Sequence, residues 1–535
     1  MGIPQRPLAV CATAAATALA TVAAAALFTA AAGEGVNGTG TATWTSVTDS
    51  VGLVTSPSAK WGGALIADLD GDGWYDLVLN NHDQTTLQLF WNNRNGQFTR
   101  AEDPLPFLID AHGMTAGDIF LTGSSDFIVM QGGANGGAPA TPRLLRSLGS
   151  SRKLVQAQRA TTLEADTGGR GRTPLLVDMD GDGDLDLILL NYVVSPEASG
   201  PRQRVYENRN GVYVRRNDSG LEDANVERAI LTDLNGDGWM DVVAFPFLRI
   251  YIATGPFTFV DRTYDWLRGI PNRGSIGTSV WAAAELDVNG DGRWDLYLAR
   301  RWQSDVLLIN DDNSRFVVAP PPAGKNRGHS DVTVGDFNND GATDVFLSYS
   351  AEPVADGGAV ARPDVLLTGD GQGGFTASTD HGANQVSLAA GDSVQAFDYD
   401  LDGRLDLLVG AGDEVVGRGP LGSWSLFANT SPQPADGGGH WLLVDVGRSP
   451  NRKAAPSNAL VTVTAAYADG KGTTRSIVRR VGGAGGSGIS DDLRIVHFGL
   501  GDRDTIEELT VEWSDGSSVE RTDVPVDARY VVTTV

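Results

Sequence analysis

Short apolar runs alternate with polar turn sequences along most of the chain, and no long stretch of helical periodicity interrupts them. Runs of strand length, such as 64–67 and 77–79, flank an acidic loop, and the same arrangement returns at 175–177 and 187–190. Short runs of this kind, bounded by Gly and Asp, are typical of β-strands. The pattern therefore predicts an all-β chain built from repeated strand pairs.

The acidic loops repeat one nonapeptide pattern. Six copies carry Asp at positions one, five and nine, Asp or Asn at position three and Gly at position six; they begin at residues 68, 178, 233, 287, 336 and 398. A degenerate copy keeps only its first and last carboxylates, Asp118 and Asp126. The seven starts lie 49 to 62 residues apart, a period that suits one four-stranded propeller blade. We predict a seven-bladed β-propeller.

The spacing of the acids suits calcium, which prefers six or more oxygen ligands. Side chains at positions one, three, five and nine and the carbonyl of position seven can surround one ion, and Gly at position six permits the bend. We predict about six Ca²⁺ sites, and none in the degenerate loop. The predicted ligands are Asp68, Asp70, Asp72, Trp74 and Asp76; Asp178, Asp180, Asp182, Asp184 and Asp186; Asp233, Asn235, Asp237, Trp239 and Asp241; Asp287, Asn289, Asp291, Arg293 and Asp295; Asp336, Asn338, Asp340, Ala342 and Asp344; and Asp398, Asp400, Asp402, Arg404 and Asp406.

An EF-hand begins with a similar loop, but it needs a Glu at position twelve and a helix on each side. Position twelve is Leu79 in the first copy and Leu189 in the third, and both lie in apolar strand sequences. The loops are therefore predicted to join two strands.

The motif Asp-x-[Asp/Asn]-x-Asp-Gly-x-x-Asp, followed by an apolar strand, resembles the FG-GAP/VCBS repeat of integrin α-subunit propellers. The resemblance covers about residues 42–431 and implies seven blades with Ca²⁺ held between the first two strands of a blade. It also implies that a strand near the N-terminus completes the last blade and closes the ring.

The last hundred residues show a second resemblance. After a Gly-rich linker at 432–439, His440-Trp441-Leu-Leu-Val, His497-Phe-Gly-Leu-Gly501 and Val511-Glu-Trp-Ser-Asp-Gly516 resemble the ASPIC/UnbV domain that follows such repeats in cartilage-acidic-protein-like proteins. Pro456-Ser-Asn-Ala459 stands where that family has Gly-x-Gly-Ala. We expect residues 440–535 to form a small, sandwich-like all-β domain.

Residues 1–32 are typical of an export signal, with Arg6, an uncharged stretch and Ala30-Ala31-Ala32 before Gly33. Cleavage is predicted; an uncleaved anchor is the alternative. No other segment is apolar over a membrane-spanning length, so no further membrane insertion is expected. Cys11 is the only cysteine, so the mature chain lacks disulfides, zinc-thiolate sites and a cysteine nucleophile. We predict a secreted, periplasmic or cell-surface protein.

The other candidate motifs favour no enzyme. Gly483-Ala-Gly-Gly-Ser-Gly488 fits a phosphate-loop pattern, but a strand follows it where a helix is required, so it is interpreted as a flexible turn. The six histidines lack metal spacing, although His82 and His112 lie near blade loops and can face the ring. No local catalytic signature or cofactor motif is present.

The net charge of −26 and the pI of about 4.5 argue against a nucleic-acid partner. We therefore predict a secreted calcium-binding interaction or adhesion protein that is not an enzyme and whose partner is an extracellular protein or glycan. The alternative is a carbohydrate-binding protein, or an enzyme acting on polysaccharides, that uses the propeller face.

Overall fold

The computed structural model describes residues 40–532, except 55–62, 81–84, 103, 106–108, 133–140, 167–168, 193–201, 321–327, 350–351, 354–358, 361, 385–390, 412–421, 468–472, 483–484 and 487–488. The predicted export signal, and His82 among the residues named above, lie outside the described residues. No helix in the described part is long and apolar enough to cross a membrane.

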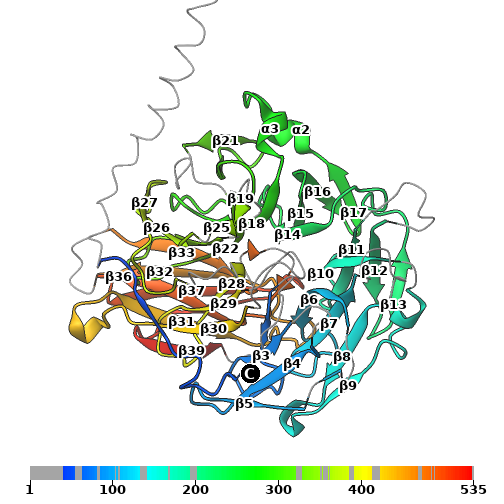
Figure 1. The fold of residues 1–535 in the computed structure, drawn as a ribbon, viewed down its shortest axis with the longest axis horizontal. Coiled ribbons are helices and arrows are strands. Elements are labelled where there is room, and N and C mark those ends of the chain that lie inside the picture. The colour runs from blue at the N-terminus through cyan, green and yellow to red at the C-terminus, as the bar shows by residue number, and fades with distance from the viewer. Residues whose placement is uncertain are drawn as a thin grey trace, which may run out of the picture.

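Seven antiparallel sheets form the blades of a β-propeller, as the repeat predicts (Figure 1). Within each blade the strands follow one another across the sheet. The first six blades comprise β2(Leu65–Ala67), β3(Asp76–Leu79), β4(Gln88–Asn92) and β5(Phe98–Arg100); β6(Ala111–Gly117), β7(Asp126–Gln131), β8(Arg143–Ser147) and β9(Leu154–Gln156); β10(Gly171–Val177), β11(Asp186–Asn191), β12(Arg204–Asn208) and β13(Tyr213–Arg216); β14(Arg228–Thr232), β15(Asp241–Phe245), β16(Arg249–Gly255) and β17(Thr258–Asp261); β18(Val280–Leu286), β19(Asp295–Arg300), β20(Val306–Asn310) and β21(Phe316–Ala319); and β22(His329–Gly335), β23(Asp344–Tyr349), β26(Val365–Gly369) and β27(Phe375–Ser378).

The seventh blade closes the ring. It contains β28(Gly391–Phe397), β29(Asp406–Ala411) and β30(Trp424–Asn429), and its outermost strand is β1(Trp44–Ser46) from the other end of the repeat region. Trp44 pairs with Asn429 in this antiparallel ladder. The predicted closure by an N-terminal strand is thus confirmed.

Apolar burial holds the ring together from blade to blade. The two inner strands of a blade are almost wholly buried, for example β11 and β19, because both faces of each sheet pack on neighbouring blades. The core clusters accordingly join consecutive blades: Ile188 of the third blade packs in one cluster with Val242 of the fourth, and Val345 of the sixth packs with Tyr297 of the fifth.

Short elements decorate the blades. The fourth blade is followed by two single-turn helices, α2(Thr263–Trp266) and α3(Arg273–Ile276), and the sixth carries the hairpin β24(Glu352–Pro353) and β25(Ala359–Val360). Among the described residues, 3-10 turns occur at η3(Gly149–Ser151), η4(Leu163–Ala165) and η5(Pro434–Asp436).

Two further sheets form the C-terminal domain. One contains β31(His440–Val446), β36(Ile495–Gly501) and β39(Ala528–Val532); the other contains β32(Leu460–Ala466), β33(Arg475–Arg480), β37(Thr505–Glu512) and β38(Ser518–Arg521). A single apolar core that includes Leu442, Phe498 and Trp513 fills the space between the sheets. The domain is therefore a small β-sandwich.

The Gly-rich segment of this domain inserts among the innermost propeller strands. Its short strand β34(Gly485–Gly486) pairs with β18, and β35(Ile489–Ser490) pairs in parallel with β6. The Asp491 carboxylate then accepts hydrogen bonds from the Ile66 amide at 2.8 Å and from Gln395 Nε2. The described residues Gly485 and Gly486 thus form a strand and not the flexible turn that the sequence suggests, because β18 of the fifth blade supplies their backbone partners.

Candidate metal centres

Each acidic loop joins the first and second strands of its blade, so all seven lie at one end of the propeller. At position one of every loop, an Asp accepts a hydrogen bond from the amide of the Gly at position six, over 2.6 to 2.9 Å. That glycine has a positive φ, such as 85° at Gly73, which a residue with a Cβ adopts at a cost. The first carboxylate therefore shapes the loop even before any ion is considered.

The carboxylate at position nine joins the loop to the rest of its blade. In every blade one of its oxygens accepts a third-strand amide over 2.7 to 2.9 Å. In six blades the donor is the residue that ends the strand, and in the fourth it lies two residues earlier; the donors are Asn92, Ser147, Asn208, Ala253, Asn310, Gly369 and Asn429. The other oxygen accepts an amide from the start of the loop, as between Asp186 and Met179 at 2.7 Å.

These two sets of bonds explain the degenerate second loop. Asp118 accepts the amides of Thr122 and Gly123, and Asp126 accepts those of Phe120 and Ser147. The two carboxylates that this loop retains are the two that hold backbone amides. The two that it has lost stand at positions three and five, where the carboxylates of the complete loops bond only within the loop or to arginines, as in the bond from the Asp184 amide to Asp182.

The donor sets of the complete loops fit a hard cation. In three of them, carboxylate oxygens at positions one, three and nine lie within 4.8 Å of one another; the groups are Asp68, Asp70 and Asp76; Asp178, Asp180 and Asp186; and Asp398, Asp400 and Asp406. Clustered carboxylate oxygens are the ligands that Ca²⁺ prefers. In the fourth, fifth and sixth loops, the amide of the position-three Asn donates to the position-five Asp, for example Asn235 to Asp237 at 2.8 Å.

The third loop carries five carboxylates, one more than any other complete loop. Burial and the negative charge of Asp182 raise the pKa of Asp184 to about 7, and burial raises the pKa of Asp186 to about 9. The Asp184 Oδ1 atom is buried and accepts no hydrogen bond. No Lys or Arg in the described part of the chain forms an ion pair with the five carboxylates of this loop. A divalent cation here would supply both the missing charge and the missing partner.

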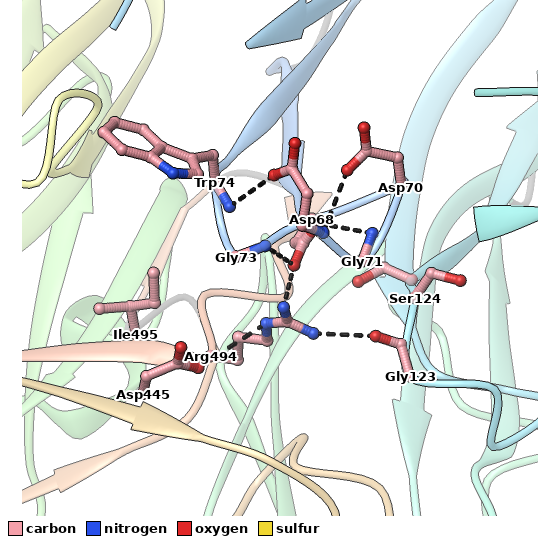
Figure 2. Close-up of polar contacts among 12 residues, drawn as sticks. Asp68, Asp70, Gly71, Gly73, Trp74, Gly123, Ser124, Asp445, Arg494 and Ile495 are labelled. Atoms are coloured by element: carbon pink, nitrogen blue, oxygen red, sulfur yellow. Dashed lines mark hydrogen bonds and ion pairs between the residues drawn. The ribbon is translucent and has the colours of Figure 1, made fainter. Parts of the chain in front are cut away.

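The first loop is neutralised by arginines. Arg494 of the C-terminal domain pairs with Asp68 and donates to the Gly123 carbonyl at 3.0 Å (Figure 2). Arg152 of the second blade contacts Asp70 at 2.6 Å and Asp72 at 3.3 Å. Arg94 of the first blade contacts Asp72 at 2.8 Å. Three guanidinium groups thus face the four carboxylates of a loop whose sequence is a full copy of the motif.

The C-terminal domain covers the end of the propeller that carries the acidic loops. Arg480 forms a buried pair with Glu285, and His497 Nε2 lies 3.1 Å from the Gly403 carbonyl at position six of the seventh loop. Gly499, in the Phe-Gly-Leu-Gly motif, packs so closely on Asp336 of the sixth loop that a Cβ there would clash. Residues that carry the family resemblance are therefore contacts to the loops.

Sequence reasoning missed a ring of side chains that link neighbouring blades. Asn92, Asn310 and Asn429, which end third strands, donate through Nδ2 to the carbonyl at position two of the preceding blade's loop, over 2.8 to 3.1 Å. Ser147 makes the equivalent bond to Leu69. The recurrence of Asn at this place in the repeat is the signal that marks these residues.

Comparison with known families agrees with this architecture. The family model of the FG-GAP-like repeat matches residues 68–129, 178–244 and 287–347, and that of ASPIC and UnbV matches 447–535. The chain is therefore an FG-GAP-like repeat propeller with a C-terminal ASPIC/UnbV domain. No curated protein matches the sequence.

Several solved structures are similar at low identity. An Agrocybe aegerita lectin that recognises non-reducing terminal N-acetylglucosamine is 17% identical, with 62% of this chain and 82% of the lectin covered and a TM-score of 0.44. The V. cholerae biofilm matrix protein Bap1 is 10% identical, with 90% and 75% covered and a TM-score of 0.27. An exo-β-1,3-galactanase of Phanerochaete chrysosporium is 10% identical, with 79% and 96% covered and a TM-score of 0.28. At these scores the similarities carry no argument about function.

Proposed function

We propose that the protein is a secreted binding protein whose propeller is stabilised by calcium in its acidic loops. The observation that carries the proposal is the third loop, where five carboxylates crowd together and pair with no Lys or Arg in the described part of the chain. Burying like charges is unfavourable unless a cation neutralises them. Calcium would convert this repulsion into a link between the first two strands of the blade.

The calcium sites would be structural. The carboxylates at positions one and nine already hold the backbone of each loop. The C-terminal domain packs over several of the loops, as at Gly499 and His497. This cover occupies part of the acidic end of the propeller. A partner, an extracellular protein or a glycan, would bind elsewhere on the molecule.

Thermal unfolding in EDTA and in millimolar Ca²⁺ tests the proposal. A site held about 100-fold above its Kd adds about 2.7 kcal/mol to stability, so several sites should raise the Tm strongly. Asp180→Ala should reduce the rise, because Asp180 stands at position three of the third loop and accepts only one weak backbone bond, 3.3 Å long. Asp261→Ala, at an exposed acid outside the loops, is the matched control. An equal Tm in EDTA and Ca²⁺, with no calcium bound to the purified protein, would refute the proposal.

A further inference from the structure

The fourth and sixth loops offer an ion the same donors. Each has Asp at positions one, five and nine and Asn at position three. In both, the position-five carboxylate accepts the amide of position seven and the side-chain amide of the position-three Asn, over 2.8 to 2.9 Å. No Lys or Arg in the described part of the chain forms an ion pair with the carboxylates of either loop. A difference between the two loops must therefore come from their surroundings.

Access to solvent separates the two loops. In the sixth loop Asp340 is 2% exposed, whereas its counterpart in the fourth, Asp237, lies at the surface. The glycine at position six shows the same contrast. A Cβ added to Gly238 of the fourth loop would meet no atom within 4 Å, whereas one added to Gly341 of the sixth would lie 3.6 Å from the guanidinium group of Arg475. The sixth loop is thus buried beneath another part of the chain.

The C-terminal domain and the linker before it bury the sixth loop. The Gly501 amide donates to the carbonyl of Asn339, at position four of the loop, over 2.9 Å. Gly499 packs on Asp336 and Gly439 packs on Asn339, each so closely that a Cβ there would clash. We call four of the residues that contact the loop the lid: Gly439, Arg475, Gly499 and Gly501.

The lid belongs to the packed sandwich. Gly501 lies in β36 and pairs with His440, which follows Gly439 at the start of β31. Leu442 and Phe498, of the same two strands, are fully buried in the core of the sandwich. The lid therefore cannot open by rotation of a side chain, because part of the C-terminal domain must move away from the sixth blade.

We propose that the lid traps the calcium ion of the sixth loop, whereas the ion of the fourth loop exchanges freely with solvent. The inference rests on the proposed function, since it requires calcium in both loops. Release from the sixth loop would need the lid to open, and openings of packed, hydrogen-bonded segments are rare events. The ion would therefore enter before the C-terminal domain docks, and the sixth blade would keep it when calcium in the surroundings falls.

Release of calcium to a chelator tests the inference on the full-length, calcium-loaded protein. Mixing with an excess of the fluorescent chelator quin-2 measures the number of ions released per chain against time. We expect one ion per chain to leave at least about hundredfold more slowly than the ion of the fourth loop, because the lid must open first. A protein that binds no calcium would refute the proposed function. One that binds calcium but releases all of it in a single fast phase would overturn this inference alone.

A matched pair of variants assigns the phases of release to the two loops. Asp340→Asn and Asp237→Asn change the same position of the sixth and fourth loops, where the carboxylates accept equivalent bonds. Asp340→Asn should abolish the slow phase, and Asp237→Asn should remove about one ion from the fast phase, because each loop loses a charged ligand. A slow phase that persists in Asp340→Asn would place the trapped ion in another loop and contradict the inference.

A third variant changes the lid without replacing a predicted ligand. Gly439→Ala places a methyl group against the Asn339 carbonyl, so it should push the lid off the loop and speed the slow release at least about tenfold. Gly447→Ala is the control, because the nearest atom to a Cβ added there is 3.9 Å away. Circular dichroism checks that each variant is folded. A slow release that is unchanged in folded Gly439→Ala would show that the C-terminal domain does not trap the ion.

Discussion

The acidic loops of the first and third blades carry the same carboxylates at positions one, three, five and nine, yet their surroundings differ. Arg94, Arg152 and Arg494 pair with the first loop, and two of them come from the second blade and the C-terminal domain. The third loop has a fifth carboxylate, Asp184, and no such partners in the described part of the chain. A ligand motif therefore specifies the donors, while distant residues determine whether the site still needs a cation.

The largest expected difference between the two loops is the calcium-dependent loss of stability when the Asp at position nine is replaced. Asp76→Ala and Asp186→Ala each remove a buried acceptor of two backbone amides, so each should cost about 3 kcal/mol in EDTA, somewhat less for Asp186 because crowding is relieved. In Ca²⁺, Asp186→Ala should lose about a further 2.7 kcal/mol at 100-fold excess over Kd. Asp76→Ala should lose little more, because arginines already neutralise its loop.

Denaturant unfolding of the parent and of both variants, in EDTA and in Ca²⁺, measures the loss of stability of each variant in each condition. Asp126→Ala supplies a third reference, since its loop retains the backbone bonds and lacks the acids at positions three and five. An equal calcium-dependent loss at Asp76 and Asp186 would mean that the arginines do not replace the ion.

A smaller effect is expected from the arginines themselves. Replacing Arg152 and Arg494 together by Gln removes the charges that pair with Asp68 and Asp70 but leaves every carboxylate of the first loop. The variant should bind about one more Ca²⁺ per chain than the parent, because the loop regains an unmet need for a cation. Metal analysis after equilibrium dialysis gives the count, with Arg262→Gln as the matched control; an unchanged count would show that the first loop binds calcium beside its arginines or never does.

Much of the fold follows from the sequence because the repeat is local. Each acidic loop with its flanking apolar runs specifies two strands and a turn within some twenty residues, and the period fixes the number of blades. The degenerate second copy also forms its blade, since Asp118 and Asp126 are the residues that bind backbone amides.

Features that depend on contacts between distant segments could not be predicted. Arg494 pairs with Asp68, which lies 426 positions earlier in the sequence, and nothing in the sequence around either residue indicates this contact. The Gly-rich segment has the sequence of a turn, because the strands that pair with it, β18 and β6, belong to propeller blades far from it in the sequence.

The smallest difference between the two loops should appear as a pH dependence in EDTA. The folded-state pKa values of Asp184 and Asp186, about 7 and about 9, lie above the free value of 3.8, so the native state binds more protons than the unfolded state between these limits. Their contribution to stability is present at pH 4 and is lost as the pH rises toward 9. The Tm in EDTA should therefore fall between pH 5 and 8, and Ca²⁺, which binds the ionised carboxylates, should oppose the fall at the upper end. Asp184→Asn should make the EDTA profile less steep, because the pKa of Asp184 lies inside this window. A profile in EDTA that rises with pH, or that is equally steep after Asp184→Asn, would show that arginines or solvent neutralise the third loop as fully as the first.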